Sequence, residues 1–254
     1  MRIDILTLFP EMFEGVITSS IAKRAIEKEI IEVHIHDFRE NSSKANKRVD
    51  DYSYGGGAGM IIEIQPVLDC LRTIPNWEKA HKIITTPVAH TYKQSKAVAL
   101  SRLDHIIIIC GHYEGIDSRI MNFVDEGISI GDYILTGGEI PSMIVADSII
   151  RLLDGAIKNE STLEESFENG LLEYPQFTTP RVFEGYEVPD ILFSGNHKAI
   201  KEYRFKQSVS KTLSVRPELI DVANFNKQEL KWFNDLENDS KLQEAIVKAK
   251  KFMK

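Results

Sequence analysis

The sequence predicts an α/β fold built on a mostly parallel sheet. Four short apolar runs, at residues 3–8, 31–35, 83–85 and 106–110, are typical of buried strands. Helix-compatible spacing of apolar residues falls between most of them, at 21–30, 66–74 and 92–103. Because strands that alternate with helices form parallel sheets with helical covers, this is the most economical architecture. Ligands of such sheets bind at the carboxyl ends of the strands.

The chain is long enough for one large or two modest domains. It has 254 residues, of which 43% are hydrophobic, so it can bury a sizeable core. Residues 1–156 carry the alternating pattern, and 157–170 form a polar stretch that we interpret as a flexible interdomain linker. Residues 171–254 are predicted to form a smaller helical domain, with helices near 197–213, 226–236 and 241–253.

Composition predicts a cytoplasmic protein. No apolar stretch reaches about 18 residues, and the N-terminus begins directly with strand-like alternation, so neither a transmembrane helix nor a signal peptide is expected. The two cysteines, Cys70 and Cys110, are far apart and lack any CxxC or Cys/His cluster. A disulfide framework or a zinc site is therefore not expected, and Cys110 is predicted to be a buried small hydrophobe.

The segment 128–141, ISIGDYILTGGEIP, is the most informative part of the chain. Two glycine turns, Gly131-Asp132 and Gly137-Gly138, interrupt apolar residues and leave the backbone open to close approach. Pro141 suits the first turn of a helix that continues over 143–153. The apolar residues are predicted to be short buried strand pieces: Ile128, Ile130, Tyr133, Ile134 and Leu135. The pattern favours a nucleotide-like pocket, and a plain pair of tight turns is the alternative.

Charge is unevenly distributed along the chain. The formal net charge of −7 argues against indiscriminate nucleic-acid binding. Residues 195–216, however, hold six lysines and arginines against one glutamate, together with Tyr203, Phe205 and Gln207, which suit RNA. A solvated helix face is the other explanation. No P-loop, HExxH, GxSxG or EF-hand motif is present, and the glycine cluster 55–59 does not fit GxGxxG, which favours a flexible or ligand-covering loop.

Several long motifs occur in an order that resembles one known family. They are LFPEMF from Leu8, VDDYSYGGGAGM from Val49, CGHYEGID from Cys110, ISIGDYILTGGEIP from Ile128, LFSGNH from Leu192 and KQS from Lys206. On these motifs the chain resembles, over nearly its whole length, the bacterial tRNA (guanine-N1)-methyltransferases of the SPOUT class. The resemblance implies an α/β sheet with a deep trefoil knot, a rare exception to unthreaded topology that no periodicity could have indicated.

The resemblance also implies a methyl donor, S-adenosylmethionine, bound in the knot. Backbone groups of Ile130, Tyr133 and Leu135 would read the adenine, and Glu114 would hold ribose hydroxyls or lie near the donor's positive charge. Glu114 bonding to local backbone amides, and an ordinary surface pair between Asp117 and Arg119, are the plainer alternatives. The donor-binding residues implied are Thr86, Pro87, Gly111, Tyr113, Glu114, Gly115, Ser129, Ile130, Gly131, Tyr133, Leu135, Gly137, Gly138 and Pro141.

Two residues match the catalytic positions of the family. Glu165, before Ser166-Phe167, stands where the family more often has an aspartate that removes the guanine N1 proton. Arg151 matches an arginine that stabilises negative charge on guanine O6. Each also has a structural alternative: Glu165 could complete a capping box with Thr162, and Arg151 could pair with Asp147 four residues earlier.

The family's substrate is tRNA, methylated at the guanosine in position 37 next to the anticodon, and its sites are shared between two identical subunits. Candidate tRNA contacts are Ser194, Asn196, His197, Arg204, Lys206, Gln207 and Ser208. The resemblance leaves open a dependence on Mg²⁺. This chain departs from the family pattern at Ser53, Ala58, Ala89 and His112, the last replacing a common arginine. A SPOUT enzyme acting on another RNA position, and a noncatalytic tRNA-binding protein, are the competing hypotheses.

Overall fold

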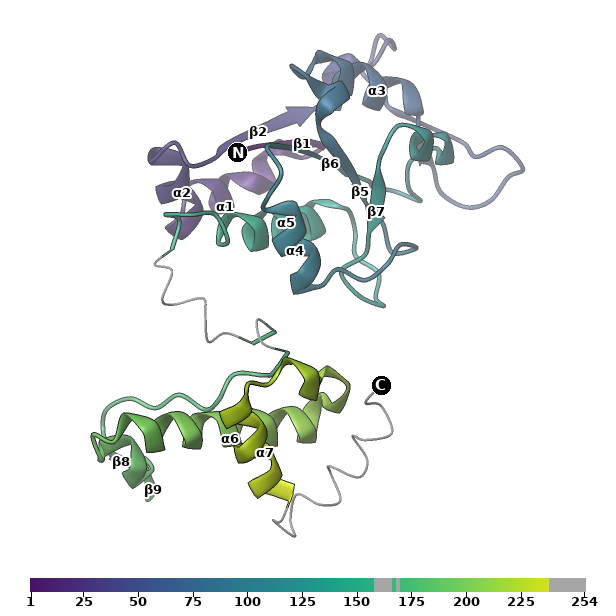
Figure 1. The fold of residues 1–254 in the computed structure, drawn as a ribbon. Coiled ribbons are helices and arrows are strands. Elements are labelled where there is room, and N and C mark those ends of the chain that lie inside the picture. The colour runs from purple at the N-terminus through teal and green to yellow at the C-terminus, as the bar shows by residue number, and fades with distance from the viewer. Residues whose placement is uncertain (158–165, 168–169, 238–254) are drawn as a thin grey trace. The chain divides into compact units, whose positions relative to one another are not determined.

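A computed structural model describes residues 1–157, 166–167 and 170–237 of the chain (Figure 1). The chain divides into two compact units, Met1–Asn159 and Glu160–Lys254. This division falls within the stretch predicted to be a linker, of which 158–165 and 168–169 lie outside the described residues. In the described part of the chain, no helix is both long and apolar enough to cross a membrane.

The N-terminal unit contains a five-stranded, fully parallel sheet in the order β2-β1-β6-β5-β7. Its strands are β1 (Arg2–Thr7), β2 (Glu32–Asp37), β5 (His81–Thr85), β6 (His105–Cys110) and β7 (Glu126–Ile128). The register places Ile3 between Val33 on β2 and Ile106 on β6. The predicted parallel sheet and its four apolar strands are therefore confirmed, each to within two residues at its ends.

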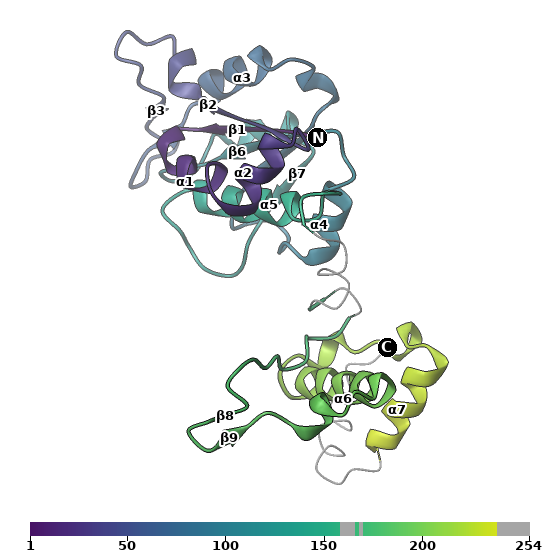
Figure 2. The same cartoon turned by 90° about the vertical axis from the view of Figure 1, so that its left-hand side faces the viewer.

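Helices cover both faces of this sheet (Figures 1 and 2). Successive residues of a strand point to opposite faces, so Ile106 and Ile108 of β6 join one core cluster and Ile107 and Ile109 join the other. The first cluster includes residues of α2 (Ser20–Glu27) and α5 (Glu139–Ile150), and the second includes residues of α3 (Ile64–Thr73). The short α1 (Glu14–Ile17) and α4 (Gln94–Leu100) complete the predicted α/β alternation.

Smaller elements carry the loops between these layers. The two-stranded pair β3 (Asp50–Asp51) and β4 (Ile61–Ile62) encloses the glycine cluster 55–59, which forms an exposed loop. Single-turn 3₁₀ helices occur at Pro10–Phe13, Phe38–Asn41, Trp77–Lys79, Ser118–Asn122, Asp190–Phe193, Pro217–Leu219 and Val222–Asn224. Neither the hairpin nor these turns were predicted, because they are too short to show a hydrophobic period.

The C-terminal unit is helical around its own core. It comprises the hairpin strands β8 (Val182–Phe183) and β9 (Tyr186–Glu187), followed by α6 (His197–Val215) and α7 (Lys227–Glu237). The side chain of Asn196 caps α6 by accepting a hydrogen bond from the backbone of Ala199 at 3.2 Å. The apolar core of the C-terminal unit is formed by Leu171, Val209, Leu213, Ile220, Phe225, Phe233 and Leu236. The predicted helices at 197–213 and 226–236 are confirmed, and the one at 241–253 lies outside the described residues.

Candidate functional site

One cavity gathers the residues expected to bind the donor. It has a volume of about 860 Å³ and lies at the carboxyl ends of β5, β6 and β7, where the loops 86–92, 111–116 and 129–138 begin. This is where a parallel α/β sheet binds ligands. The following predicted residues all line this cavity: Thr86, Pro87, Gly111, Tyr113, Glu114, Gly115, Ser129, Ile130, Gly131, Tyr133, Leu135, Gly137, Gly138 and Pro141.

The floor of the cavity is a close backbone contact at Gly138, where α5 begins. The Gly138 amide donates to the Gly111 carbonyl oxygen at 2.7 Å, and the Thr85 hydroxyl donates to the Gly138 carbonyl oxygen at 3.3 Å. A Cβ at position 138 would lie 2.8 Å from the Cα of Cys110 and would also collide with the Thr85 hydroxyl. Only glycine therefore permits this join between two of the loops.

The third loop is tied to the same floor by backbone pairing. Thr86 donates its amide to the Ile128 carbonyl, Tyr92 donates to that of Ser129, and Ser129 donates to that of His90, at 2.7–3.1 Å. The hydroxyl of Tyr92 forms a hydrogen bond with that of Ser148 at 2.7 Å, which connects this loop to α5. Burial raises the pKa of Tyr92. Sequence reasoning missed several lining residues of this loop, although their place directly after a predicted strand was a usable signal: Val88, His90, Thr91 and Tyr92.

One sequence expectation about this cavity was wrong. Tyr133, Ile134 and Leu135 are not buried strand pieces, because β7 ends at Ile128 and these side chains are 54%, 80% and 36% exposed. Ile130, predicted in the same way, also lies beyond the strand and is only half-buried. They belong to an unpaired loop at the edge of the cavity. Apolar residues that face a pocket have the same local pattern as residues that face a core, so the sequence alone did not distinguish the two.

The loop after β6 contributes the charged side of the cavity. Glu114 is exposed, its amide donates to the Met60 carbonyl at 3.0 Å, and its side chain packs against Gly59 of the glycine cluster. The ring of His112 lies 4.8 Å from that of Phe9 and 5.6 Å from that of Tyr113, measured between centroids. The glycine-rich loop 55–59 and the LFPEMF motif therefore lie beside the loop that follows β6.

Asp117 and Arg119, just beyond this loop, form the surface pair that was the plainer alternative. The guanidinium of Arg119 donates to Asp117 at 2.5–3.1 Å, and Arg119 is exposed. The bond from Arg119 lowers the pKa of Asp117 despite an opposing contribution from burial. Both side chains are therefore satisfied by each other.

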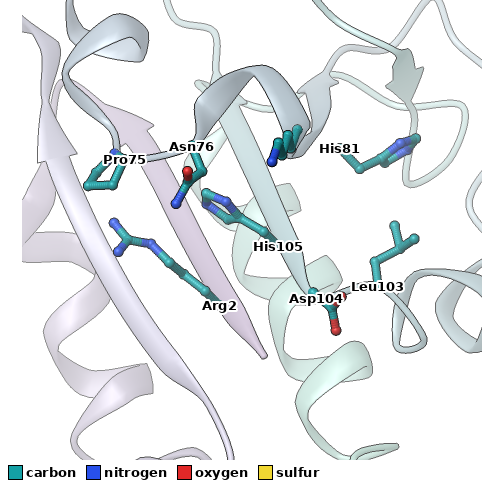
Figure 3. Close-up of a pocket in the computed structure, with 8 residues that line it drawn as sticks. Arg2, Pro75, Asn76, His81, Leu103, Asp104 and His105 are labelled. Atoms are coloured by element: carbon teal, nitrogen blue, oxygen red, sulfur yellow. The ribbon is translucent and has the colours of Figure 1, made fainter.

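A second cavity, of about 580 Å³, opens at the amino ends of β1, β5 and β6 (Figure 3). Its wall contains Arg2, His81 and His105, but these groups already bind carboxylates: Arg2 and His105 bind Asp4, and His81 binds Glu126 at 2.7 Å. This cavity is at the opposite end of the sheet from the glycine loops. None of the residues predicted to bind the donor lines this second cavity.

A family model described as tRNA (guanine-1)-methyltransferase TrmD matches residues 1–222. The chain belongs to this family.

Relatives of the family in three Bacillus species align over nearly their whole length, and each is named tRNA (guanine-N(1)-)-methyltransferase. The protein of Bacillus pumilus (strain SAFR-032) is 48% identical over 244 residues, which cover 94% of this chain and 100% of the relative. That of Bacillus cereus (strain B4264) is 46% identical over 243 residues, with the same coverage. That of Bacillus anthracis (strain CDC 684) is 47% identical over 240 residues, covering 93% of this chain and 98% of the relative.

Of the two residues predicted to be catalytic, Arg151 lies within the described residues and Glu165 does not. Arg151 is half-buried and caps the C-terminal end of α5, where its amide donates to the Asp147 carbonyl at 3.1 Å. Side-chain pairing between Asp147 and Arg151 stays a prediction. Glu165 lies outside the described residues, as do Thr162 and the rest of the capping box proposed for that stretch.

The candidate tRNA contacts lie on α6 and in the segment just before it, in the C-terminal unit. Ser194, Asn196 and His197 are exposed at its start. Arg204 stacks over Tyr174 at 4.7 Å, and Lys206 pairs with Glu202 at 2.7 Å. Gln207 is half-buried, whereas Ser208 is only 7% exposed and lies beside the core of this unit.

No metal centre is evident in the part of the chain that the structure describes. Within 1–157, 166–167 and 170–237, no group of three or more histidine, cysteine, aspartate or glutamate residues is arranged to hold a metal ion. Both cysteines are buried and free, and the predicted burial of Cys110 is confirmed.

Proposed function

We propose that the protein transfers a methyl group from S-adenosylmethionine to N1 of the guanine at position 37 of tRNA. The observation that carries this proposal is the convergence of three separate sequence motifs on one cavity of about 860 Å³, in a chain that belongs to the tRNA (guanine-1)-methyltransferase family. A donor of this size needs a concave site with open backbone groups, which the glycine loops supply. Because the proposed substrate is tRNA, we further propose a cytoplasmic location.

The donor would be held by the loops that follow β5, β6 and β7. The Gly137-Gly138 turn places no side chain in the way of an adenine, and Glu114 and Tyr113 stand at the exposed side. The direct pairing of Gly138 with Gly111, and of Ser129 with His90, supports the deep trefoil knot that we propose for these segments. The donor supplies an electrophilic methyl group on a sulfonium when it is bound.

Guanine N1 carries a proton and becomes a good nucleophile only as that proton leaves. We propose Glu165 as the general base that accepts it. Negative charge then builds on guanine O6, where the guanidinium of Arg151 would stabilise it. The position of Arg151 at the end of α5, the helix that starts at the donor cavity, supports this role. A dependence of this step on Mg²⁺ stays a prediction.

The C-terminal unit would bind the tRNA. The basic residues of α6 are concentrated in an otherwise acidic chain, and the exposed residues at its start offer hydrogen-bonding groups. Among the candidate contacts, the exposed or half-buried ones remain in this proposal: Ser194, Asn196, His197, Arg204, Lys206 and Gln207. Ser208, being buried, is better explained as a packing residue of the helical core.

We also propose a homodimer in which the two subunits share active sites. Exposed apolar side chains support a partner on α5: Ile140 and Ile144 lie one turn apart and are 44% and 43% exposed, and Met12 is 42% exposed. Mixing subunits that carry Glu165→Gln with subunits that carry Arg151→Ala tests this arrangement. Recovery of activity in the mixture is expected if each site takes these two residues from different chains.

The decisive experiment is methyl transfer to unmodified tRNA transcripts carrying guanosine or adenosine at position 37, with the product mapped by nuclease digestion and mass spectrometry. 1-Methylguanosine formed only with the guanosine transcript is the expected result. Glu165→Gln and Arg151→Ala should then each lower the rate at least 10²-fold, the order expected for a general base or a charge-stabilising group. Methylation at another position, or tight binding without transfer, would overturn the proposal in favour of the two competing hypotheses.

A further inference from the structure

The carboxylate of Glu139 is buried beside the donor cavity, and the proposed methyl transfer makes no use of it. Glu139 is the first residue of α5 and is only 1% exposed. Its Oε1 accepts a hydrogen bond from the Thr7 hydroxyl at 2.8 Å, and the same hydroxyl oxygen accepts one from the Phe9 amide at 3.0 Å. Glutamates are almost never fully buried unless a cation pairs with them. In the described part of the chain, no lysine, arginine or histidine forms an ion pair with Glu139.

The other carboxylate oxygen lies directly behind the cavity wall. A Cβ at Gly137 would collide with Oε2 of Glu139, and it would also lie 2.8 Å from Nε2 of His112. Gly137 and Gly138 both line the donor cavity. Oε2 of Glu139 therefore lies beside Gly137 and the ring of His112, both of which line the space in which the donor is proposed to bind.

Glu139 lies at the amino-terminal end of α5. The first turn of a helix stabilises anions through its unpaired amides and its dipole. Because the carboxylate is shielded from water, its field is screened less than that of an exposed group. Glu114, the other carboxylate at this cavity, is exposed, so solvent weakens its field.

Methyl transfer changes the charge of the nucleoside in this cavity. The donor's sulfonium carries one positive charge, and loss of the methyl group as a cation equivalent leaves an uncharged thioether, while the guanine loses its N1 proton. A buried anion behind the cavity wall would attract the sulfonium form and not the thioether.

We propose that Glu139 is a specificity-determining residue that makes the cavity prefer the cationic donor over the neutral thioether product. This inference rests on the proposed function for the identity of the ligand. The Thr7 hydroxyl orients the carboxylate, and the Gly137 turn lets it approach the cavity. The preference would speed replacement of product by fresh donor after each turnover.

Calorimetric titration of the full-length protein tests this proposal without any methyl transfer, so its failure is distinguishable from failure of the proposed function. Three ligands are compared: S-adenosylmethionine, S-adenosylhomocysteine and sinefungin, in which a protonated amine replaces the sulfonium. Glu139→Gln keeps the shape of the side chain and can still bond to Thr7. It should weaken binding of both cationic ligands about tenfold relative to the thioether.

Thr7→Val removes the hydrogen bond that orients the carboxylate and keeps the charge. It should leave a preference for the two cationic ligands that is smaller than in the wild type. Glu139→Asp retains the charge and should preserve the ratio of affinities even if all three fall, which keeps the test decisive should Glu139→Gln not fold. Equal weakening of all three ligands by Glu139→Gln, or loss of the ratio in Glu139→Asp, would overturn the proposal.

Discussion

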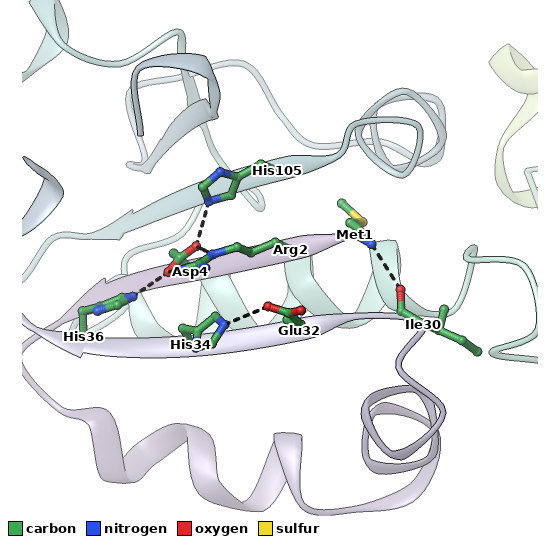
Figure 4. Close-up of polar contacts among 8 residues, drawn as sticks. All are labelled: Met1, Arg2, Asp4, Ile30, Glu32, His34, His36 and His105. Atoms are coloured by element: carbon green, nitrogen blue, oxygen red, sulfur yellow. Dashed lines mark hydrogen bonds and ion pairs between the residues drawn. The ribbon is translucent and has the colours of Figure 1, made fainter. Parts of the chain in front are cut away.

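Replacing Asp4 by asparagine should destabilise the N-terminal unit strongly. Asp4 lies in the middle of β1, is fully buried, and accepts four hydrogen bonds (Figure 4). They come from Nε and Nη2 of Arg2 at 2.6 and 2.8 Å, from Nε2 of His36 at 2.6 Å and from Nε2 of His105 at 2.7 Å. The network joins three adjacent strands, β2, β1 and β6.

The magnitude follows from these contacts. An asparagine side chain has one accepting oxygen, so the donors that face its amide nitrogen lose their partner. Hydrogen bonds to a charged group contribute about 1.5–3 kcal/mol each. Arg2 and His36 can recover some of this from water, since their side chains are 27% and 26% exposed. We expect a net loss of about 3 kcal/mol, or a fall in Tm of roughly 6–12 °C for a unit of this size.

The effect should depend on pH in a defined direction. Burial alone would raise the pKa of Asp4, but the hydrogen bonds from Arg2, His36 and His105 outweigh it and hold the pKa well below its usual range. The folded state therefore binds fewer protons at this carboxyl than the unfolded state, so the stabilisation is complete above the unfolded pKa of about 3.9 and declines as the pH falls below it.

Urea unfolding followed by circular dichroism at pH 7, 5 and 3 measures this difference in the free energy of unfolding. The gap between wild type and Asp4→Asn should be smaller at pH 3 than at pH 5, because the Asp4 carboxyl of the unfolded state becomes protonated over this range. Asp104→Asn, at an exposed position one residue before β6, is the matched control and should change stability by less than about 0.5 kcal/mol. A gap below 1 kcal/mol at pH 7, or one undiminished at pH 3, would refute the reasoning.

Three further outcomes are expected. Gly138→Ala should abolish measurable donor binding in calorimetry, because its Cβ would collide with backbone at Cys110 and with the Thr85 hydroxyl; retained affinity would show that the loops can separate. Cys70 and Cys110 should react with iodoacetamide only on unfolding, since burial raises the pKa of both thiols, that of Cys70 to about 12; rapid labelling of the native protein would contradict their burial. Phe233→Ala should destabilise the C-terminal unit by about 3–5 kcal/mol and leave donor affinity unchanged, because Phe233 belongs to a separate core; a parallel loss of donor binding would argue against that independence.

Local patterns in the sequence were sufficient for most of the secondary structure. Runs such as HIIIIC at 105–110 are apolar on both faces, which only a doubly covered strand requires, so β6 was predictable to within one residue. Strand order was not, because it depends on contacts between segments far apart in the chain, such as Arg2 with His105. The Asp4 network was missed for the same reason: its partners lie 32 and 101 residues away.

The candidate site divides in a similar way. The resemblance to a family indicated the residues around the cavity, while hydropathy misassigned Tyr133, Ile134 and Leu135, because apolar residues at a pocket edge and in a core look alike. Glu139 was not identified from the sequence. Local patterns predict that a glutamate in the first turn of a helix is solvated. The fold buries this one, because it brings Thr7, 132 residues away in the sequence, into contact with the carboxyl group.

The hydrogen-bond network around Asp4 and the cavity occupy different parts of the same sheet. Away from the cavity, Asp4 in the middle of β1 binds side chains from its own strand and from the two strands beside it, β2 and β6. At the carboxyl end, the loops meet through glycine backbones and leave a cavity. Fixing a strand at one end restricts the position of its other end, since a strand is a stiff, hydrogen-bonded element. The polar network therefore contributes to the precision of the donor cavity without touching it, and Asp4→Asn should weaken donor binding only under conditions where the sheet itself begins to unfold.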